Sequence, residues 1–199
     1  MTDGIVSIDF EELQMITNIC QDMNNDNPAR RRICDILSAR QEGKPFRVLF
    51  VCLGNICRSP AAEGIMRDIV ESKGRQDGWV IDSAGTGAYH IGDLPDRRMR
   101  VHARQRGLEL THRARQVDTE DFLDFDMIVA MDASNVSNLR RVAPSVEAER
   151  KIVPMAAFFT DTSRYDHVPD PYYEGAEGFE LVLDLLQDGC RNLFETFDN

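Results

Sequence analysis

Short apolar runs alternate with longer amphipathic segments along most of the chain. Four runs have the length of buried strands and lie at residues 48–51, 78–81, 127–131 and 151–155. The segments with helical spacing lie at residues 60–74, 95–107, 118–123, 132–142 and 179–197. Strands that alternate with helices predict parallel βαβ units with right-handed crossovers. We therefore expect an α/β fold, a Rossmann-like three-layer αβα domain with a four-stranded parallel sheet.

The first 45 residues show helical patterns and no strand. One segment begins after Asp9, a candidate N-cap, and a second begins at Pro28 and ends near Gly43, with a turn rich in Asn and Asp between them. We expect a helical hairpin in residues 1–45, followed by one domain in residues 46–199. Packing against the domain, binding of a partner or a second copy of the chain, and disorder are the three interpretations of this extension.

Composition limits the partners. Apolar residues make up 42% and charged residues 29%, as in ordinary globular proteins, and the formal net charge is −11. This charge argues against nucleic acid and against anionic membranes as partners. No apolar run approaches the roughly 20 residues that span a bilayer, and the acidic N-terminus is unlike a signal peptide. Five irregularly spaced cysteines predict neither a disulfide framework nor a zinc site, so we expect a cytoplasmic protein.

Residues 46–62, FRVLFVCLGNICRSPAA, combine a strand, a loop and a helix start. The strand delivers Cys52 into a loop with Gly54 and Asn55, and Arg58 follows six residues after the cysteine. Loop N–H groups and the unpaired N–H groups of the helix start converge on one point, which favours a bound anion. The same field favours a thiolate. The sequence therefore predicts that a nucleophile and a phosphate site coincide here.

Polar residues follow three of the predicted strands. Cys52, Ser83 and Asp132 each come at or just past the end of an apolar run. In open parallel sheets, ligands bind at the carboxyl ends of the strands. We expect these three side chains at one rim of the sheet.

The motif C-x5-R-S resembles the signature of protein tyrosine phosphatases, and the string CLGNICRSP resembles that of the low-molecular-weight class. This resemblance implies that Cys52 is the nucleophile and that Arg58 clamps the phosphate. It also implies a general acid, Asp170 in the string DPYY, beside two tyrosines that line the pocket, Tyr172 and Tyr173. Ser59 would donate a hydrogen bond to the thiolate.

The resemblance extends to residues around the loop. Ser83 and His112 match residues that brace the cradle in this family, and Asp132 lies in a matching string, MDASN. Tyr89 and Leu53 are expected to form facing walls of the slot. The remaining substrate-binding residues implied by the resemblance are Gly54, Asn55, Ile56 and Cys57. Cys57 would form a reversible disulfide with the nucleophile, and no metal or cofactor is implied.

We expect hydrolysis of phosphotyrosine through a cysteinyl-phosphate intermediate, and three other functions are the alternatives to it. Thioredoxin-coupled arsenate reductases share the cradle but need two further cysteines downstream, and none lies between Cys57 and Cys190. Arginine phosphatases of this family tend to carry Thr where this chain has Ile56. A non-catalytic phosphate-binding scaffold would have no need for an intact nucleophile, clamp and acid. We expect phosphotyrosine-containing proteins as substrates, and surface or packing roles for His90, His102 and His167.

Overall fold

The computed structural model describes residues 27–198. The first expected helix of the N-terminal hairpin lies outside the described residues and stays a prediction. The second is present as α2, Pro28–Ser38, which begins at Pro28 as expected but ends at Ser38, before the expected end near Gly43. It is N-capped by Asn27, whose side-chain oxygen accepts a 2.9 Å hydrogen bond from Ala29 N.

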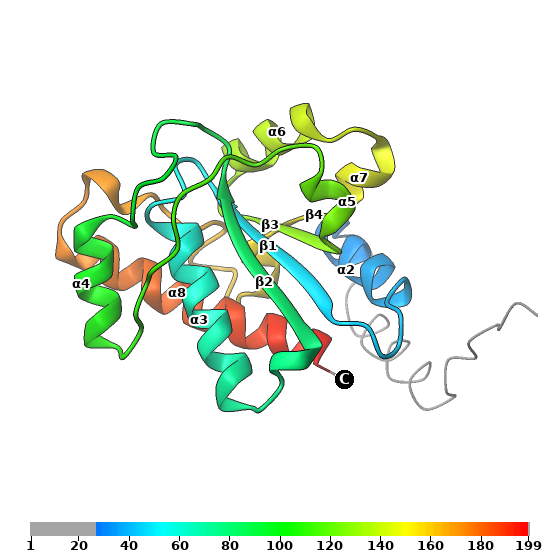
Figure 1. The fold of residues 1–199 in the computed structure, drawn as a ribbon, viewed down its shortest axis with the longest axis horizontal. Coiled ribbons are helices and arrows are strands. Elements are labelled where there is room, and N and C mark those ends of the chain that lie inside the picture. The colour runs from blue at the N-terminus through cyan, green and yellow to red at the C-terminus, as the bar shows by residue number, and fades with distance from the viewer. Residues whose placement is uncertain (1–26, 199) are drawn as a thin grey trace, which may run out of the picture.

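A four-stranded parallel sheet forms the centre of the molecule, as expected (Figure 1). Its strands are β1 Phe46–Cys52, β2 Trp79–Gly85, β3 Met127–Ala130 and β4 Ile152–Pro154, in the order β2-β1-β3-β4. Cys52, the last residue of β1, pairs with Gly85 in β2. The nucleophile candidate therefore stands at the carboxyl end of a central strand.

Helices cover both faces of the sheet. They are α3 Arg58–Ser72, α4 Arg97–Gln105, α5 Asp121–Asp124, α6 Ala133–Val142, α7 Val146–Arg150 and α8 Ala176–Phe197, with 3₁₀ turns η1 Gln76–Gly78, η2 Met155–Phe158 and η3 Pro171–Tyr173. Side chains alternate along β1: Val48 and Phe50 join the core formed with α2, α3, α4 and α8. Leu49 and Val51 join the second core, formed with α5, α6 and α7. All four are fully buried, which explains why β1 is an unbroken apolar run.

The extension helix α2 packs on the domain. Its buried residues Ile33, Ile36 and Leu37 belong to the larger core, and Arg32 Nη1 donates a 2.9 Å hydrogen bond to Ile152 O at the start of β4. Cys34, on the same helix, is disulfide-bonded, whereas Cys52, Cys57 and Cys190 are free thiols. Within residues 27–198, no helix combines the length and hydrophobicity needed to cross a bilayer.

The topology places a crevice at the carboxyl end of β1. Helix α3 leads from β1 to β2, and the chain then crosses to β3 on the other side of β1. The strands that follow β1 in the sequence, β2 and β3, therefore lie on opposite sides of β1 in the sheet. This is the switch point at which open α/β sheets bind ligands.

Candidate active site

The loop of residues 53–57 joins β1 to α3 and forms the cradle. Three of its carbonyls accept hydrogen bonds from surrounding segments: Leu53 O from Gly87 N at 2.8 Å, Ile56 O from Asp96 N at 2.7 Å, and Cys57 O from Ala61 N at 3.3 Å. Because the N–H and C=O of a peptide unit point in opposite directions, these bonds leave loop N–H groups for the interior of the cradle. The arrangement suits an anion.

Asn55 holds the cradle together. Its φ of +55° is the one positive value at a non-glycine residue in the described part of the chain. Its Nδ2 donates to Ser59 Oγ and to Ser83 Oγ, both at 2.9 Å. Both amide hydrogens are then used, so the single hydrogen of Ser59 goes to Cys52 Sγ at 3.1 Å or to Ala84 O at 3.2 Å. The first choice supplies the thiolate with a hydrogen bond.

A buried carboxylate, Glu63, supports this network from α3. Glu63 Oε2 accepts from Ser83 Oγ at 2.7 Å and lies 3.0 Å from His112 Nδ1, while His112 Nε2 lies 3.0 Å from Asn55 Oδ1. Burial acts to raise the pKa of Glu63, but the hydrogen bond and charge of His112, helped by Ser83, hold that pKa below its ordinary value. Because both ring nitrogens face acceptors, the imidazolium form of His112 satisfies the geometry.

Glu63 and His112 lie with Asp82 in a group whose ligand atoms could hold a metal ion. Each carboxylate in the group is already engaged, because Asp82 Oδ2 accepts from Arg115 Nε at 3.0 Å and Glu63 accepts from Ser83. This arrangement favours an ion-paired brace for the cradle. Sequence reasoning found Ser83 and His112 but missed Glu63, which joins them.

Arg58 opens α3 and is 3% exposed. Nη1 lies 2.6 Å from Asp132 Oδ2, and Nη2 lies 2.8 Å from Asp170 Oδ2. Burial acts to lower the pKa of Arg58, but Cys52 and the two carboxylates outweigh it and raise the pKa. Nε is buried and has no hydrogen-bond partner among the described residues. One donor of the guanidinium is therefore left for a ligand.

Asp132 has two functions in this arrangement. Its Oδ1 accepts a 2.7 Å hydrogen bond from Asn135 N and so caps α6, while Oδ2 holds Arg58. Asp132, which follows β3, thereby binds Arg58, which follows the loop after β1. Of the three residues expected past the ends of strands, Asp132 follows β3, Cys52 is the last residue of β1, and Ser83 lies within β2, paired with Phe50.

The two cysteines of the loop differ in environment. Both are buried and both are free thiols. Burial, followed by the charges of Asp96, Cys52 and Asp170, raises the pKa of Cys57 well above its ordinary value. Cys57 therefore stays a neutral thiol at physiological pH, whereas Cys52 has the hydroxyl of Ser59 beside it.

A slot of about 240 Å³ lies over the cradle, with Cys52 and Arg58 among its lining residues. Leu53, Tyr89, Tyr172 and Tyr173 form its apolar walls, and Asp170 also lines it. Gly54, Ile56 and Cys57 also line the slot, whereas Asn55 and Ser59, which the sequence assigns to substrate binding, are not among its lining residues. Tyr89 and Tyr173 are 80% and 93% exposed, so both stand at the mouth.

Known proteins resemble this chain over the same region. Residues 47–199 match the model of a family described as low molecular weight phosphotyrosine protein phosphatase. The chain belongs to this family. A member from Schizosaccharomyces pombe, named low molecular weight phosphotyrosine protein phosphatase, is 44% identical over 154 residues, which are 77% of this chain and 97% of that protein.

Solved structures of family members agree with the fold. A protein tyrosine phosphatase from Entamoeba histolytica superposes with a TM-score of 0.73 at 42% identity, covering 77% of this chain and 97% of that one. An arginine phosphatase from Drosophila superposes with a TM-score of 0.71 at 33% identity, covering 76% and 98%. The family match begins at residue 47, so helix α2 lies outside it.

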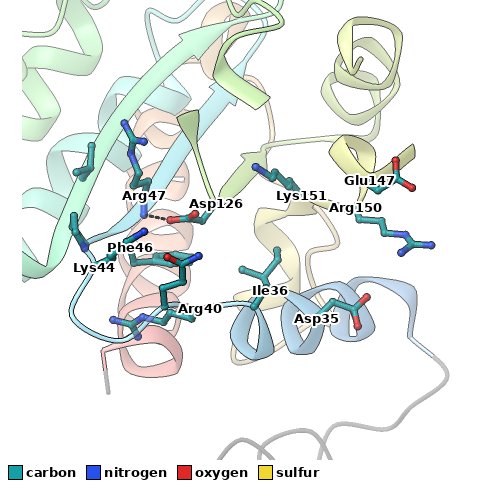
Figure 2. Close-up of a pocket in the computed structure, with 14 residues that line it drawn as sticks. Asp35, Ile36, Arg40, Lys44, Phe46, Arg47, Asp126, Glu147, Arg150 and Lys151 are labelled. Carbon is teal, nitrogen blue, oxygen red and sulfur yellow. Dashed lines mark hydrogen bonds between the residues drawn. The ribbon is translucent and has the colours of Figure 1, made fainter. Parts of the chain in front are cut away.

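The structure contains a larger cavity, of about 720 Å³, at the amino ends of the strands and away from the slot (Figure 2). It lies between α2, the starts of β1 and β2, and the segment from α7 to β4. Two of its cations make structural contacts: Lys151 Nζ donates to Phe122 O and Phe125 O at 2.7 and 2.8 Å, and the Arg47 guanidinium lies over the ring of Phe125. None of its lining residues is a cysteine, serine or histidine. We interpret this cavity as part of the interface between the extension and the domain.

His90, for which a surface or packing role is expected, lies beside the active site. It lines the slot, and its Nδ1 lies 3.2 Å from Asp93 Oδ2. A Cβ added at Gly54 would come within 3.0 Å of this ring, so His90 packs directly against the cradle. A single histidine in a loop carries no sequence signal for such a position.

Proposed function

We propose that residues 46–199 hydrolyse phosphotyrosine through a cysteinyl-phosphate intermediate and that residues 1–45 are an extension of this domain. The observation that carries the proposal is the convergence of Cys52, Arg58 and Asp170 on one slot with tyrosines at its walls. The names of the relatives support the substrate class, since the Schizosaccharomyces pombe and Entamoeba histolytica proteins are named as phosphotyrosine or tyrosine phosphatases.

In the first step, the thiolate of Cys52 attacks phosphorus. The Sγ–P bond forms and the bond from phosphorus to the phenolic oxygen breaks. Asp170, in its protonated form, donates its proton to the departing oxygen, so that a neutral tyrosine leaves. The guanidinium of Arg58 and the loop N–H groups bind the phosphoryl oxygens, on which charge develops.

In the second step, water attacks the cysteinyl phosphate. The carboxylate of Asp170 takes a proton from the water as the new P–O bond forms, and the Sγ–P bond breaks. Ser59 Oγ donates a hydrogen bond to the departing thiolate, at the contact of 3.1 Å seen between Cys52 Sγ and Ser59 Oγ. Inorganic phosphate leaves, and the enzyme returns to its starting state.

The walls of the slot favour an aryl phosphate. Leu53, Tyr89 and Tyr172 offer flat or apolar surfaces on which a phenyl ring would pack. Ile56 also lines the slot and has no polar group with which to recognise a guanidinium. Phosphoarginine is the second candidate, since the Drosophila relative is an arginine phosphatase with the same fold. Hydrolysis rates on matched phosphotyrosine and phosphoarginine peptides decide between the two substrates.

Hydrolysis of 4-nitrophenyl phosphate tests the mechanism. We expect Cys52→Ser and Arg58→Ala to abolish turnover and Asp170→Asn to reduce kcat/KM by roughly 10²–10⁴-fold, the usual contribution of a positioned proton donor. The matched control is Cys190→Ser, because Cys190 is a buried free thiol of α8 outside the slot. Turnover by Cys52→Ser equal to wild type would show that the mechanism is wrong.

Phosphotyrosine-containing proteins are the substrates we infer for the full chain, and the cytoplasm is the location that composition favours. A homo-oligomer or a partner bound through the N-terminal helices stays a prediction. Comparing the full chain with a version that begins near Lys44, by activity and by size in solution, tests it. The same number of copies in both assemblies, with equal activity, would remove this interpretation.

A further inference from the structure

Arg98, in the first turn of α4, occupies the space between two aromatic rings. Its guanidinium carbon lies 4.9 Å from the ring centre of Phe179 in α8 and 5.4 Å from that of Tyr172 in η3. Both distances are within the range of favourable cation–π contact. Phe179 is almost fully buried, whereas Tyr172 is 39% exposed and lines the slot. Arg98 therefore connects a fixed core ring to a wall of the active site.

The guanidinium is held in place by Asp96. Arg98 Nε donates to Asp96 Oδ1 at 3.1 Å and Arg98 Nη2 donates to Asp96 Oδ2 at 2.9 Å, a two-point contact. Asp96 also accepts from Arg98 N at 2.8 Å and thereby caps α4. A paired, planar guanidinium has little rotational freedom left. The Arg98 side chain is 46% exposed, so these contacts hold a guanidinium that solvent also reaches.

Asp96 ties this contact to the cradle. Its backbone N–H donates to Ile56 O at 2.7 Å, in the middle of the loop that carries Cys52. On the other side of Arg98, Tyr172 N donates to Asp170 Oδ1 at 3.2 Å, so the ring that Arg98 contacts is two residues from the acid. A continuous set of contacts thus runs from the cradle through Asp96, Arg98 and Tyr172 to Asp170.

We propose that Arg98 is a positioning residue, which fixes the segment of residues 170–173 relative to the cradle and so places Asp170 at the leaving-group oxygen. Arg98 does not line the slot, so it acts through Tyr172 rather than by touching substrate. The proposal rests on the proposed function, because it assigns Arg98 to the proton transfer made by Asp170.

The test compares kcat/KM for aryl phosphates whose phenols differ in acidity. Phenyl phosphate needs a proton donor more than 4-nitrophenyl phosphate does, because phenoxide is the poorer leaving group. A positioned acid contributes roughly 10²–10⁴-fold to the rate. We therefore expect Arg98→Ala to lower kcat/KM about tenfold with phenyl phosphate and less than about threefold with 4-nitrophenyl phosphate. Arg98→Lys should behave like Arg98→Ala, since the ammonium keeps the charge but not the planar two-point contact.

Arg97→Ala is the matched control, because Arg97 neighbours Arg98 on the same helix turn and, like Arg98, is an exposed arginine. Thermal unfolding of each variant confirms that it is folded. Equal losses with both substrates, or recovery of wild-type rates in Arg98→Lys, would overturn the proposal.

The same series separates this inference from the proposed function. Asp170→Asn must lose far more activity with phenyl phosphate than with 4-nitrophenyl phosphate if Asp170 is the acid. If Asp170→Asn shows that preference and the Arg98 variants do not, only the role of Arg98 is wrong. If Asp170→Asn lacks it, the assigned acid is wrong and the role of Arg98 falls with it.

Discussion

Asn55 stabilises the cradle in two ways that mutation can separate. It makes four side-chain hydrogen bonds, to Ser59 and Ser83 through Nδ2 and from His112 and Arg115 N to Oδ1. It also adopts a φ of +55°, which asparagine and glycine tolerate and alanine does not. Asn55→Gly removes the hydrogen bonds alone, whereas Asn55→Ala removes them and adds backbone strain.

The size of each effect follows from these contacts. Four buried hydrogen bonds at about 0.5–1.5 kcal/mol each give a loss of roughly 2–6 kcal/mol for Asn55→Gly. Left-handed geometry costs alanine about 1–2 kcal/mol more. For a chain of this length, 1 kcal/mol changes Tm by about 2–4 °C, so Asn55→Ala should unfold about 2–8 °C below Asn55→Gly.

Thermal unfolding and kcat/KM for 4-nitrophenyl phosphate measure the two consequences. Both variants should lose most activity, because Ser59 loses the donor that directs its own hydrogen toward Cys52. A glycine variant with wild-type Tm and kcat/KM would refute the claim that these hydrogen bonds hold the cradle. Equal Tm values for the glycine and alanine variants would refute the claim about backbone strain.

Three further predictions concern the brace, the extension and the second loop cysteine. The pKa of Glu63 is lower in the native state than in the unfolded chain, so the Glu63 carboxylate stabilises the fold above its ordinary pKa and loses this effect as the pH falls through the native pKa. The difference in Tm between wild type and Glu63→Gln should therefore become smaller between about pH 7 and pH 3. A constant difference would contradict this. Ile33→Ala should lower the free energy of unfolding by about 2–5 kcal/mol and leave kcat/KM unchanged, because Ile33 is buried. Asp35 is exposed, so Asp35→Ala should change neither quantity. After peroxide oxidises Cys52 to a sulfenic acid, attack by the Cys57 thiol would release water and form a disulfide, which dithiothreitol reduces. In Cys57→Ser, further peroxide should oxidise the sulfenic acid to a sulfinic acid, which dithiothreitol cannot reduce, so activity should return in wild type only; equal recovery of both would exclude this protection.

The sequence predicted the sheet because its central strands, β1 and β3, are buried on both faces. β1 is an uninterrupted apolar run, and it carries Cys52 to the rim where the motif also requires it. The start of α3 was less well predicted. We expected it at Pro60, but the helix begins at Arg58, and Pro60 lies within a first turn whose N–H groups need no helical partner.

Glu63 and Arg98 show what a pattern of residues cannot convey. A glutamate or arginine on a helix ordinarily faces solvent, and only the tertiary fold brings Ser83 and His112 to Glu63 or Phe179 to Arg98. The spacing of four between Ser59 and Glu63 was the one available signal, because it places both on the same face of α3. The cradle itself was predictable since its residues are contiguous.

Helix α2 is attached at the end of the molecule opposite the slot, as the direction of the strands in Figure 1 shows. Its contacts are with β4 and the larger core, and none of its residues lines the slot. The exposed face of α2 is therefore a suitable site for attaching a label. A fluorophore or a solid support coupled through Asp35 or Ser38 would leave the entrance to the slot open, so that turnover can be followed on immobilised single molecules.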